Sequence, residues 1–352
     1  MTSTGMSLVY PKMKAALLYG PEDVRVEEVD TPIPGKGEVL VKVRCVGICQ
    51  SDLRVIKGVY KNKYFDYGKD SYGLSGHEWS GEVAMLGQGV ENLEIGQHVV
   101  PEIIIPCDSC RVCRKGMTNL CPNKKNILRG YAEYAVVPAK NLYVVSPEVS
   151  FEEAALTEPV AVCLHTNEII NPRPGDNIMI IGSGPMGLLH LQISKLSGAR
   201  VIISDILDER LKVAEKLGAD LTVNPNKHNL KDEVLKFTDN YGADAVIVSV
   251  GGRKAMQDAL VCVGIGGKVI EFAGSYPTES IDLDLNTLHY KMITMTGSYD
   301  HLPIHMDRAI RLIEKKVLNV KSIISHTVNF DDLYNGFRLA ASKEGLKVIV
   351  KM

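Results

Sequence analysis

The fold class follows from residues 180–187, which read Ile180-Ile181-Gly182-Ser183-Gly184-Pro185-Met186-Gly187. They join an apolar run, 177–181, to a helical pattern, 185–197, so a Gly-x-Gly-x-x-Gly spacing falls at a strand-to-helix turn. In such a turn the first glycine permits the bend, the second lets the backbone approach a pyrophosphate, and the third lets the helix pack on the strand. The free N–H groups that begin the helix can then bind the phosphates. The alternative is a tight turn that binds no ligand.

The chain after this turn continues as alternating apolar strands and helices. Strands are expected at 201–204, 245–250 and 268–272, and a second helix at 208–217. This alternation favours a parallel sheet with crossover helices. We therefore predict an α/β dinucleotide-binding domain of the Rossmann type over residues 160–297.

Asp205 is the expected partner of the adenosine ribose. It ends the strand 201–204 and lies 23 residues beyond Gly182, near the spacing at which an acid accepts a hydrogen bond from the ribose 2′-OH. A carboxylate there repels a 2′-phosphate, which favours NAD over NADP. The alternatives are a helix N-cap and a solvent-facing acid, and Arg210 could pair with Asp205 or with a phosphate. The residues expected to hold NAD are Gly182, Gly184, Pro185, Met186, Gly187, Asp205 and Arg210.

The rest of the chain has a different pattern. At roughly 100 to 200 residues per domain, 352 residues predict two domains. Residues 1–159 are rich in valine, glycine and proline, and 38–46 alternate as a strand does, which predicts a β-rich, barrel-like domain. Residues 298–352 are expected to rejoin that first domain, with a helix at 304–316 and a final strand at 346–351.

Composition excludes some classes of partner. The chain has 40 Lys and Arg against 42 Asp and Glu, and so lacks the basic excess of a nucleic-acid binder. No apolar run approaches the roughly 20 residues that span a bilayer, and the polar start lacks a secretory core. A cytoplasmic protein is expected.

The eight cysteines divide into two groups. One group crowds onto a lobe at about 106–122 and consists of Cys107, Cys110, Cys113 and Cys121. Four soft ligands so close together fit tetrahedral zinc with no open position, which is a structural site. An iron–sulfur cluster is the rival interpretation, because spacing alone does not separate the two. The other four cysteines, scattered through apolar or glycine-containing segments, have a separate role.

A third signal is dispersed along the chain. It consists of Gly47-Ile48-Cys49-Gln50-Ser51-Asp52, Gly76-His77-Glu78-Trp79-Ser80-Gly81-Glu82 and Glu158-Pro159. Taken singly, each segment has an ordinary structural explanation, such as a buried cysteine, a core histidine or an acid that begins a helix. Their order and spacing together are far more specific than any one alone.

Together with the glycine turn and the four cysteines, these segments resemble the zinc-containing medium-chain dehydrogenase/reductase family, nearest to its polyol (sorbitol-type) and threonine dehydrogenase branches. The resemblance covers nearly the whole chain from Met13. It implies a GroES-like catalytic domain interrupted by a Rossmann domain. It also implies two zinc ions per chain, NAD as cofactor, and a homodimer or homotetramer.

The resemblance also implies the ligands of a catalytic zinc. These are Cys49, His77 and Glu78, with Glu158 at the position where the family's alcohol dehydrogenases carry a second cysteine. The carboxylate favours a polyol-type site, and whether Glu78 or Glu158 binds the metal at each step stays open. Cys163 and His165 lie close to Glu158 in sequence, and we expect the helix to turn them away.

Zinc chemistry then gives the expected reaction. A bound Zn²⁺ lowers the pKa of coordinated water from 15.7 to about 7 and should likewise favour loss of the proton from an alcohol. Ser51 matches the family's hydroxyl that passes this proton outward. Relatives often continue the relay with histidine, whereas this chain has Arg54 there, so a water or carboxylate route is the alternative.

We therefore predict oxidation of a secondary alcohol in a polyol, cyclitol or sugar alcohol to a ketone. The Tyr- and Lys-containing segment 59–74 is either part of the substrate pocket or an exposed loop or oligomer contact. One alternative function is an L-threonine 3-dehydrogenase or another amino-alcohol dehydrogenase. A second is a zinc-stabilised binding protein without catalysis.

Overall fold

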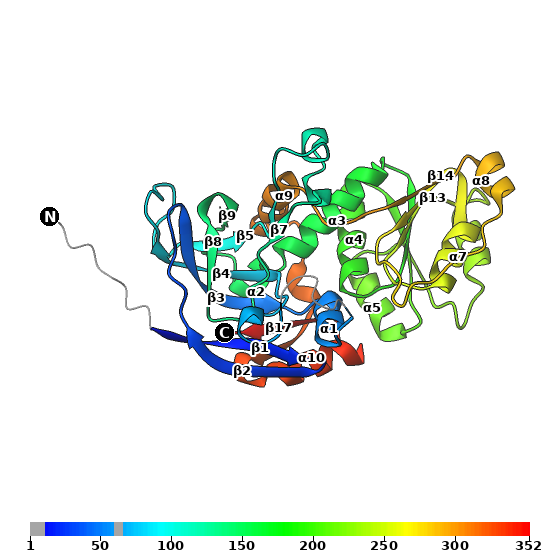
Figure 1. The fold of residues 1–352 in the computed structure, drawn as a ribbon. Helices are drawn as coiled ribbons and strands as arrows, with labels where there is room; N and C mark the ends of the chain where they lie inside the picture. Colours follow the sequence, from blue (N-terminus) through cyan, green and yellow to red (C-terminus); the bar gives the residue numbers. More distant parts are fainter. Residues whose placement is uncertain (1–10, 60–65) are drawn as a thin grey trace. The chain divides into compact units, whose positions relative to one another are not determined.

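The computed structural model describes residues 11–59 and 66–352, so the Tyr- and Lys-rich positions 60–65 lie outside the described residues. The chain divides into two compact units: Met1–Glu158 with Leu302–Met352, and Pro159–His301. In Figure 1 the first unit runs from blue through cyan into green and resumes from dark orange to red, and the second unit runs from green through yellow to orange. The sequence placed these boundaries near residues 159 and 297. No helix in the described ranges is long and apolar enough to cross a bilayer.

The second unit contains a parallel sheet of six strands in the order β12-β11-β10-β13-β14-β15. Its strands are β10 (Asn177–Ile181), β11 (Arg200–Ser204), β12 (Leu221–Val223), β13 (Ala243–Val248), β14 (Val263–Glu271) and β15 (Thr294–Gly297). The chain starts at β10, moves to one edge, and then returns to continue from β13 to the other edge. The strand order therefore reverses between β10 and β13, where doubly wound sheets bind their ligands. The predicted α/β fold with a parallel Rossmann sheet is confirmed.

Helices cover both faces of this sheet. They are α3 (Thr157–Ile170), α4 (Pro185–Leu196), α5 (Asp208–Lys216), α6 (Leu230–Phe237), α7 (Arg253–Cys262) and α8 (Leu285–Lys291). Figure 1 shows α4 and α5 on one side of the sheet and α7 and α8 on the other. Because both faces are covered, the central strands are apolar at nearly every position, and Ile178 to Ile181 are all buried.

The first unit is β-rich. Its largest sheet has the order β16-β17-β3-β4-β5-β9, and β8 pairs with residues 38–42 of β3, on the same edge as β17, which pairs with residues 45–47. The strands of this unit are β1 (Lys12–Gly20), β2 (Asp23–Asp30), β3 (Glu38–Gly47), β4 (Glu78–Leu86), β5 (His98–Pro101), β6 (Ile104–Ile105), β7 (Lys125–Asn126), β8 (Tyr134–Pro138), β9 (Leu142–Val144), β16 (Ile324–Asn329) and β17 (Lys347–Lys351). Its α-helices are α1 (Gln50–Ile56), α2 (Phe151–Ala154), α9 (Pro303–Glu314) and α10 (Leu333–Ser342).

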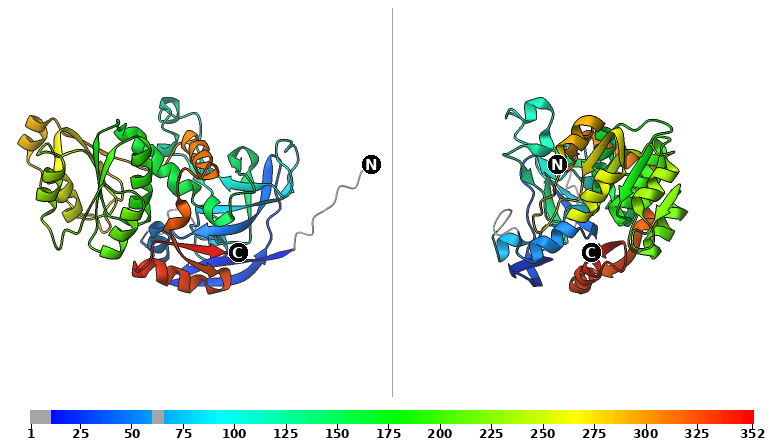
Figure 2. Two further views of the ribbon diagram at one scale, coloured as in Figure 1. Left: turned by 180° about the vertical axis from the view of Figure 1, so that it is seen from behind. Right: turned by 90° about the vertical axis from the view of Figure 1, so that its right-hand side faces the viewer.

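The C-terminal strand completes this sheet. Strand β17 pairs antiparallel with β3, so that Val350 lies opposite Val46. Figure 2 shows the red C-terminal strand beside the blue strands of the same unit. The end of the chain therefore lies next to Gly47, two residues before Cys49.

Candidate functional site

The glycine turn lies at the end of β10, where the strand order of the parallel sheet reverses. Gly182 has a φ of +99°, a conformation that favours glycine. A Cβ at Gly187 would overlap the carbonyl oxygen of Gly182, so the third glycine is required for helix packing. A Cβ at Gly184 would approach only Arg210 Nη1, at 3.7 Å. Packing within the chain therefore does not require glycine at position 184. The space beside Gly184 is open to a phosphate at the start of α4.

Asp205 lies beside this turn, as its spacing predicted. Its Oδ2 accepts a hydrogen bond from the Ser183 N–H at 2.8 Å, and its Oδ1 accepts one from the Leu207 N–H at 2.9 Å. Arg210 Nη1 lies 4.0 Å from Oδ2. Each carboxylate oxygen has two lone pairs, so Asp205 can still accept from a ligand hydroxyl while it holds the turn.

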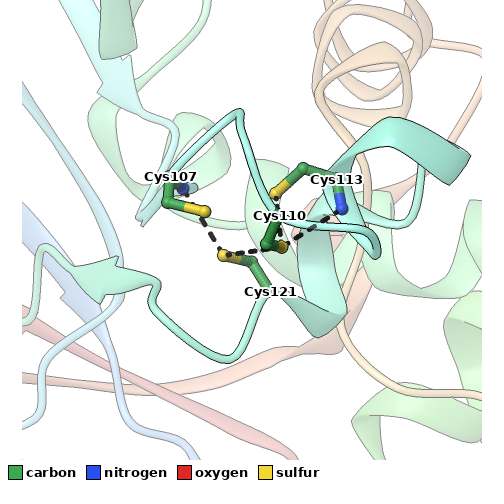
Figure 3. Close-up of side chains that lie close together, drawn as sticks. All are labelled: Cys107, Cys110, Cys113 and Cys121. Carbon is green, nitrogen blue, oxygen red and sulfur yellow. Dashed lines mark hydrogen bonds between the residues drawn. The ribbon is translucent and has the colours of Figure 1, made fainter.

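The four lobe cysteines converge on one point (Figure 3). The Cys110 sulfur lies 3.5 Å from the Cys113 sulfur and 4.0 Å from the Cys121 sulfur. Two sulfurs that each lie about 2.3 Å from a tetrahedral zinc ion are about 3.8 Å apart. The backbone N–H of Cys107 donates to the Cys121 sulfur, and that of Cys113 donates to the Cys110 sulfur, both at 3.4 Å. The spacing and the donors fit four zinc-bound thiolates.

The electrostatics of this lobe also favour a cation. Backbone N–H groups of Ser109 and Cys110 lower the pKa of the Cys107 thiol to about 5, which favours the thiolate. Burial and the neighbouring sulfurs raise the pKa of Cys113 to about 12. Four sulfurs this close cannot all ionise unless a positive ion compensates them. Zinc binding there would therefore release protons.

A second group joins Cys49, His77 and Glu78, which come from two separate segments of the first unit. One ligand atom of each lies within 4.8 Å of the others. Cys49 is the N-cap residue of α1, and Glu78 begins β4. The His77 Nδ1 lies 2.8 Å from the carbonyl oxygen of Ser75. Because a carbonyl can only accept, Nδ1 carries the proton and Nε2 is the ring nitrogen that can bind a metal.

Asp52 ties the two segments of this group together. Its Oδ2 accepts from the Cys49 backbone N–H at 2.9 Å, and its Oδ1 accepts from the Ser75 hydroxyl at 2.6 Å. Its Oδ1 also lies 3.4 Å from the His77 Nδ1. Burial lowers the pKa of His77, but the charges of Asp52 and Cys49 outweigh this effect and raise it well above its usual value. Asp52 thus supplies the carboxylate that commonly orients a metal-binding histidine.

Two family models match this chain. Residues 35–147 match the alcohol dehydrogenase GroES-like domain, and residues 185–315 match the zinc-binding dehydrogenase domain. Together these matches cover most of the chain. The chain belongs to the zinc-containing medium-chain dehydrogenases.

Relatives and solved structures of other proteins match this dehydrogenase over nearly its full length. It is 36% identical to the L-threonine 3-dehydrogenase of Pyrococcus abyssi, over 96% of this chain and 97% of the relative. It is 32% identical to the erythritol/L-threitol dehydrogenase of Mycolicibacterium smegmatis, with the same two shares. The crystal structure of a protein described as a zinc-binding dehydrogenase from Sinorhizobium meliloti, bound to NADP, has a TM-score of 0.90 at 27% identity. That match covers 97% of this chain and 99% of the other.

Family membership confirms the predicted class of enzyme. The dehydrogenase is an oxidoreductase that acts on a small-molecule alcohol with zinc and a nicotinamide cofactor. The predicted family and cofactor classes are confirmed.

Glu78 has a partner that the sequence did not indicate. Both of its carboxylate oxygens accept from the Lys347 ammonium, at 2.8 and 2.6 Å, and the two residues are 1% and 4% exposed. Burial lowers the pKa of Lys347, but Glu78, with Cys49 and Glu158, raises it above its usual value. The ammonium therefore stays charged. Any bond from Glu78 to a metal competes with this ion pair.

Replacing Lys347 with methionine is expected to destabilise the dehydrogenase by about 3 kcal/mol, because a buried carboxylate is left without its counter-charge. Lys351→Met, in the same strand, is the matched control. Lys351 pairs with Glu152 at a half-exposed position, where such pairs contribute at most about 1 kcal/mol. Urea unfolding measures both. Equal losses of stability in the two variants would contradict the importance of the buried pair.

The remaining predicted site residues lie as follows. Ser51 lies in the first turn of α1, and Glu158 lies in the first turn of α3, outside the group of Cys49, His77 and Glu78. The Cys163 sulfur donates to the Met186 carbonyl oxygen at 3.8 Å. The His165 Nδ1 lies 2.8 Å from the Asp300 carbonyl oxygen. Cys163 and His165 thus have partners within the second unit.

Sequence reasoning missed two residues of the site. Asp52 belongs to the motif at residues 47–52, but no role was predicted for it from the sequence. Its place three residues after Cys49, at the start of a helix, is a capping signal. Lys347 is 269 residues from Glu78 in the chain. Its only local signal is a lysine that opens the otherwise apolar strand Val348-Ile349-Val350.

Proposed function

We propose that this dehydrogenase oxidises a secondary alcohol of a polyol, cyclitol or sugar alcohol to a ketone, with NAD as the hydride acceptor. The observation that carries the proposal is the group of Cys49, His77 and Glu78, in which the buried Asp52 holds Cys49 and His77. Its Cys–His–carboxylate donors suit zinc, and three protein ligands leave a position open for a substrate oxygen. The lobe of four cysteines would hold a second, structural zinc.

Each part of the chain has a proposed task in this reaction. Cys49 and His77, with Glu78 or Glu158, hold the catalytic zinc. When bound, zinc acts as a Lewis acid that lowers the pKa of a hydroxyl, and the nicotinamide accepts a hydride. The Ser51 hydroxyl takes the alcohol proton and passes it to solvent, near Arg54. The substrate carbon thus loses a hydride and its oxygen a proton, which yields a ketone, NADH and H⁺.

A second candidate function is an L-threonine 3-dehydrogenase, which the 36% identity to the Pyrococcus abyssi enzyme favours. The carboxylate of Glu158, at the position of the family's second cysteine, and the identity to an erythritol/L-threitol dehydrogenase favour the polyol. Reduction of NAD and NADP would be measured with sugar alcohols, cyclitols, phosphorylated polyols and L-threonine. We expect NAD reduction with a polyol or cyclitol. Turnover of L-threonine alone would replace the first candidate with the second.

Replacing Asp205 with serine is expected to lower the preference for NAD over NADP. A hydrogen bond to a charged group contributes about 1.5 to 3 kcal/mol, so the ratio of kcat/KM values for NAD and NADP should fall about 10- to 100-fold. Asp220→Ser is the matched control, because Asp220 also accepts a backbone N–H in the same sheet, from Val201 at 2.6 Å. A ratio unchanged by Asp205→Ser would contradict the assignment of Asp205 to the ribose.

A further inference from the structure

Tyr131 reaches the metal-binding group from a distant part of the chain. Its hydroxyl donates to Asp52 Oδ2 at 2.8 Å, across 79 residues of sequence, and its side chain is 0% exposed. Asp52 is therefore held by three hydrogen-bond donors, the Cys49 N–H, the Ser75 hydroxyl and the Tyr131 hydroxyl. The Tyr131 hydroxyl shares Oδ2 with the Cys49 N–H, so it acts on the carboxylate oxygen that fixes the Cys49 backbone.

The backbone and ring of Tyr131 are fixed independently of this hydrogen bond. Its N–H donates to the Gly73 carbonyl at 3.1 Å, and its carbonyl accepts from the Ala16 N–H at 2.9 Å. Its ring packs edge-on against Phe337, with 5.3 Å between the ring centroids. The hydroxyl is thus delivered to Asp52 by a rigid support. Burial and Asp52 also raise the pKa of Tyr131 well above its usual value, so that the hydroxyl remains a donor.

We propose that Tyr131 is a positioning residue for the catalytic metal, which acts by holding the Asp52 carboxylate against both Cys49 and His77. This inference rests on the proposed function, in which Cys49 and His77 bind zinc. A carboxylate with two lone pairs on each oxygen can tilt when a donor is removed. Two of these three donors, the Cys49 N–H and the Tyr131 hydroxyl, bind Asp52 Oδ2. Without the Tyr131 hydroxyl, the Cys49 N–H is the one of them that still holds this oxygen.

A purely structural role for Tyr131 predicts a different outcome. Tyr131→Phe keeps the ring that packs against Phe337 and removes only the hydroxyl. If Tyr131 contributes only to the core, this variant should hold both zinc ions as the wild type does. If Tyr131 positions Asp52, the variant should weaken zinc binding at Cys49 and His77 while the lobe of four cysteines keeps its zinc.

The test is competition for zinc between the full-length, zinc-loaded protein and a chromophoric chelator. Because Cys49→Ser removes a ligand of the other site, the zinc that this variant retains is the zinc of the lobe. For Tyr131→Phe we expect the zinc affinity of the Cys49 site to fall about 10- to 100-fold, the usual effect of losing an outer-shell partner, with no change at the lobe. Tyr143→Phe is the matched control, because it removes a hydroxyl that donates to the Pro303 carbonyl at 3.2 Å. It should alter neither site.

A second measurement asks whether Tyr131 acts through Asp52. In an Asp52→Asn background, adding Tyr131→Phe should weaken zinc binding little further, because residues that act as one unit are not additive. Full additivity, an unchanged Cys49 site, or loss of both zinc ions with the fold would each overturn the inference. A wild-type protein that holds zinc only in the lobe would overturn the proposed function as well. Failure of the proposed function is therefore seen in the wild type, whereas failure of the inference about Tyr131 is seen only in the variants.

Discussion

Cys49→Ser is expected to lower kcat/KM for the alcohol by about 10³-fold or more. Lewis-acid stabilisation by a metal contributes several kcal/mol to the reaction, and each 1.36 kcal/mol corresponds to about a tenfold change in rate. The fold should survive, because Cys49 is the N-cap of α1 and serine is among the best N-cap residues. Steady-state rates and the thermal midpoint measure the two effects.

The matched control for this variant is the same change made in the lobe. Cys49→Ser should lose the catalytic zinc and turnover but keep its thermal midpoint, whereas the lobe variant should lose the structural zinc and lower its thermal midpoint but keep turnover. A Cys49→Ser protein with wild-type turnover would contradict the assignment of Cys49 to the catalytic metal.

Cys110→Ser is expected to destabilise the protein by about 4 kcal/mol, since loss of a metal belongs to the mutations with the largest effects. For a unit of about 200 residues this lowers the thermal midpoint by about 10 °C. The lobe has little else to hold it, because its helical turns, Cys113–Lys115 and Thr118–Leu120, are each three residues long. Turnover at low temperature should remain close to that of the wild type.

Scanning calorimetry and zinc content measure the Cys110→Ser prediction. A variant that loses turnover at low temperature but keeps its thermal midpoint would show that the lobe zinc takes part in catalysis. That result would reverse the roles we assign to the two metal sites.

The local features of this fold could be predicted from the sequence. The glycine turn joins β10 to α4, and its residues are neighbours in the chain, so their spacing alone predicts a strand-to-helix turn. The cysteine lobe is similarly local. The predicted start of strand β14 was wrong, because the strand begins at Val263 and not at residue 268. Gly264, Gly266 and Gly267 weaken the strand pattern there and hid the first half of the strand.

The contacts made by distant residues could not be predicted. Lys347 meets Glu78 only because β17 pairs with β3 at Gly47, and β3 pairs with β4 at Glu78. Tyr131 meets Asp52 only through the folded segment between β7 and β8. No periodicity in the chain encodes such pairings, because they depend on the order of strands in the sheet. The three residues Cys49, His77 and Glu78 were predicted from the family resemblance, because members of a family share the fold that brings such residues together.

The central claim is that zinc at Cys49 and His77 is required for NAD-linked oxidation of an alcohol. The most direct measurement is the zinc content of the purified protein, together with NADH formation before chelation, after chelation and after zinc is restored. We expect about two zinc ions per chain, one structural and one catalytic. We also expect turnover to disappear when the zinc at Cys49 and His77 is removed and to return when zinc is restored. A single zinc ion in the cysteine lobe, with no turnover on any alcohol, would contradict this claim and favour a binding protein without catalysis.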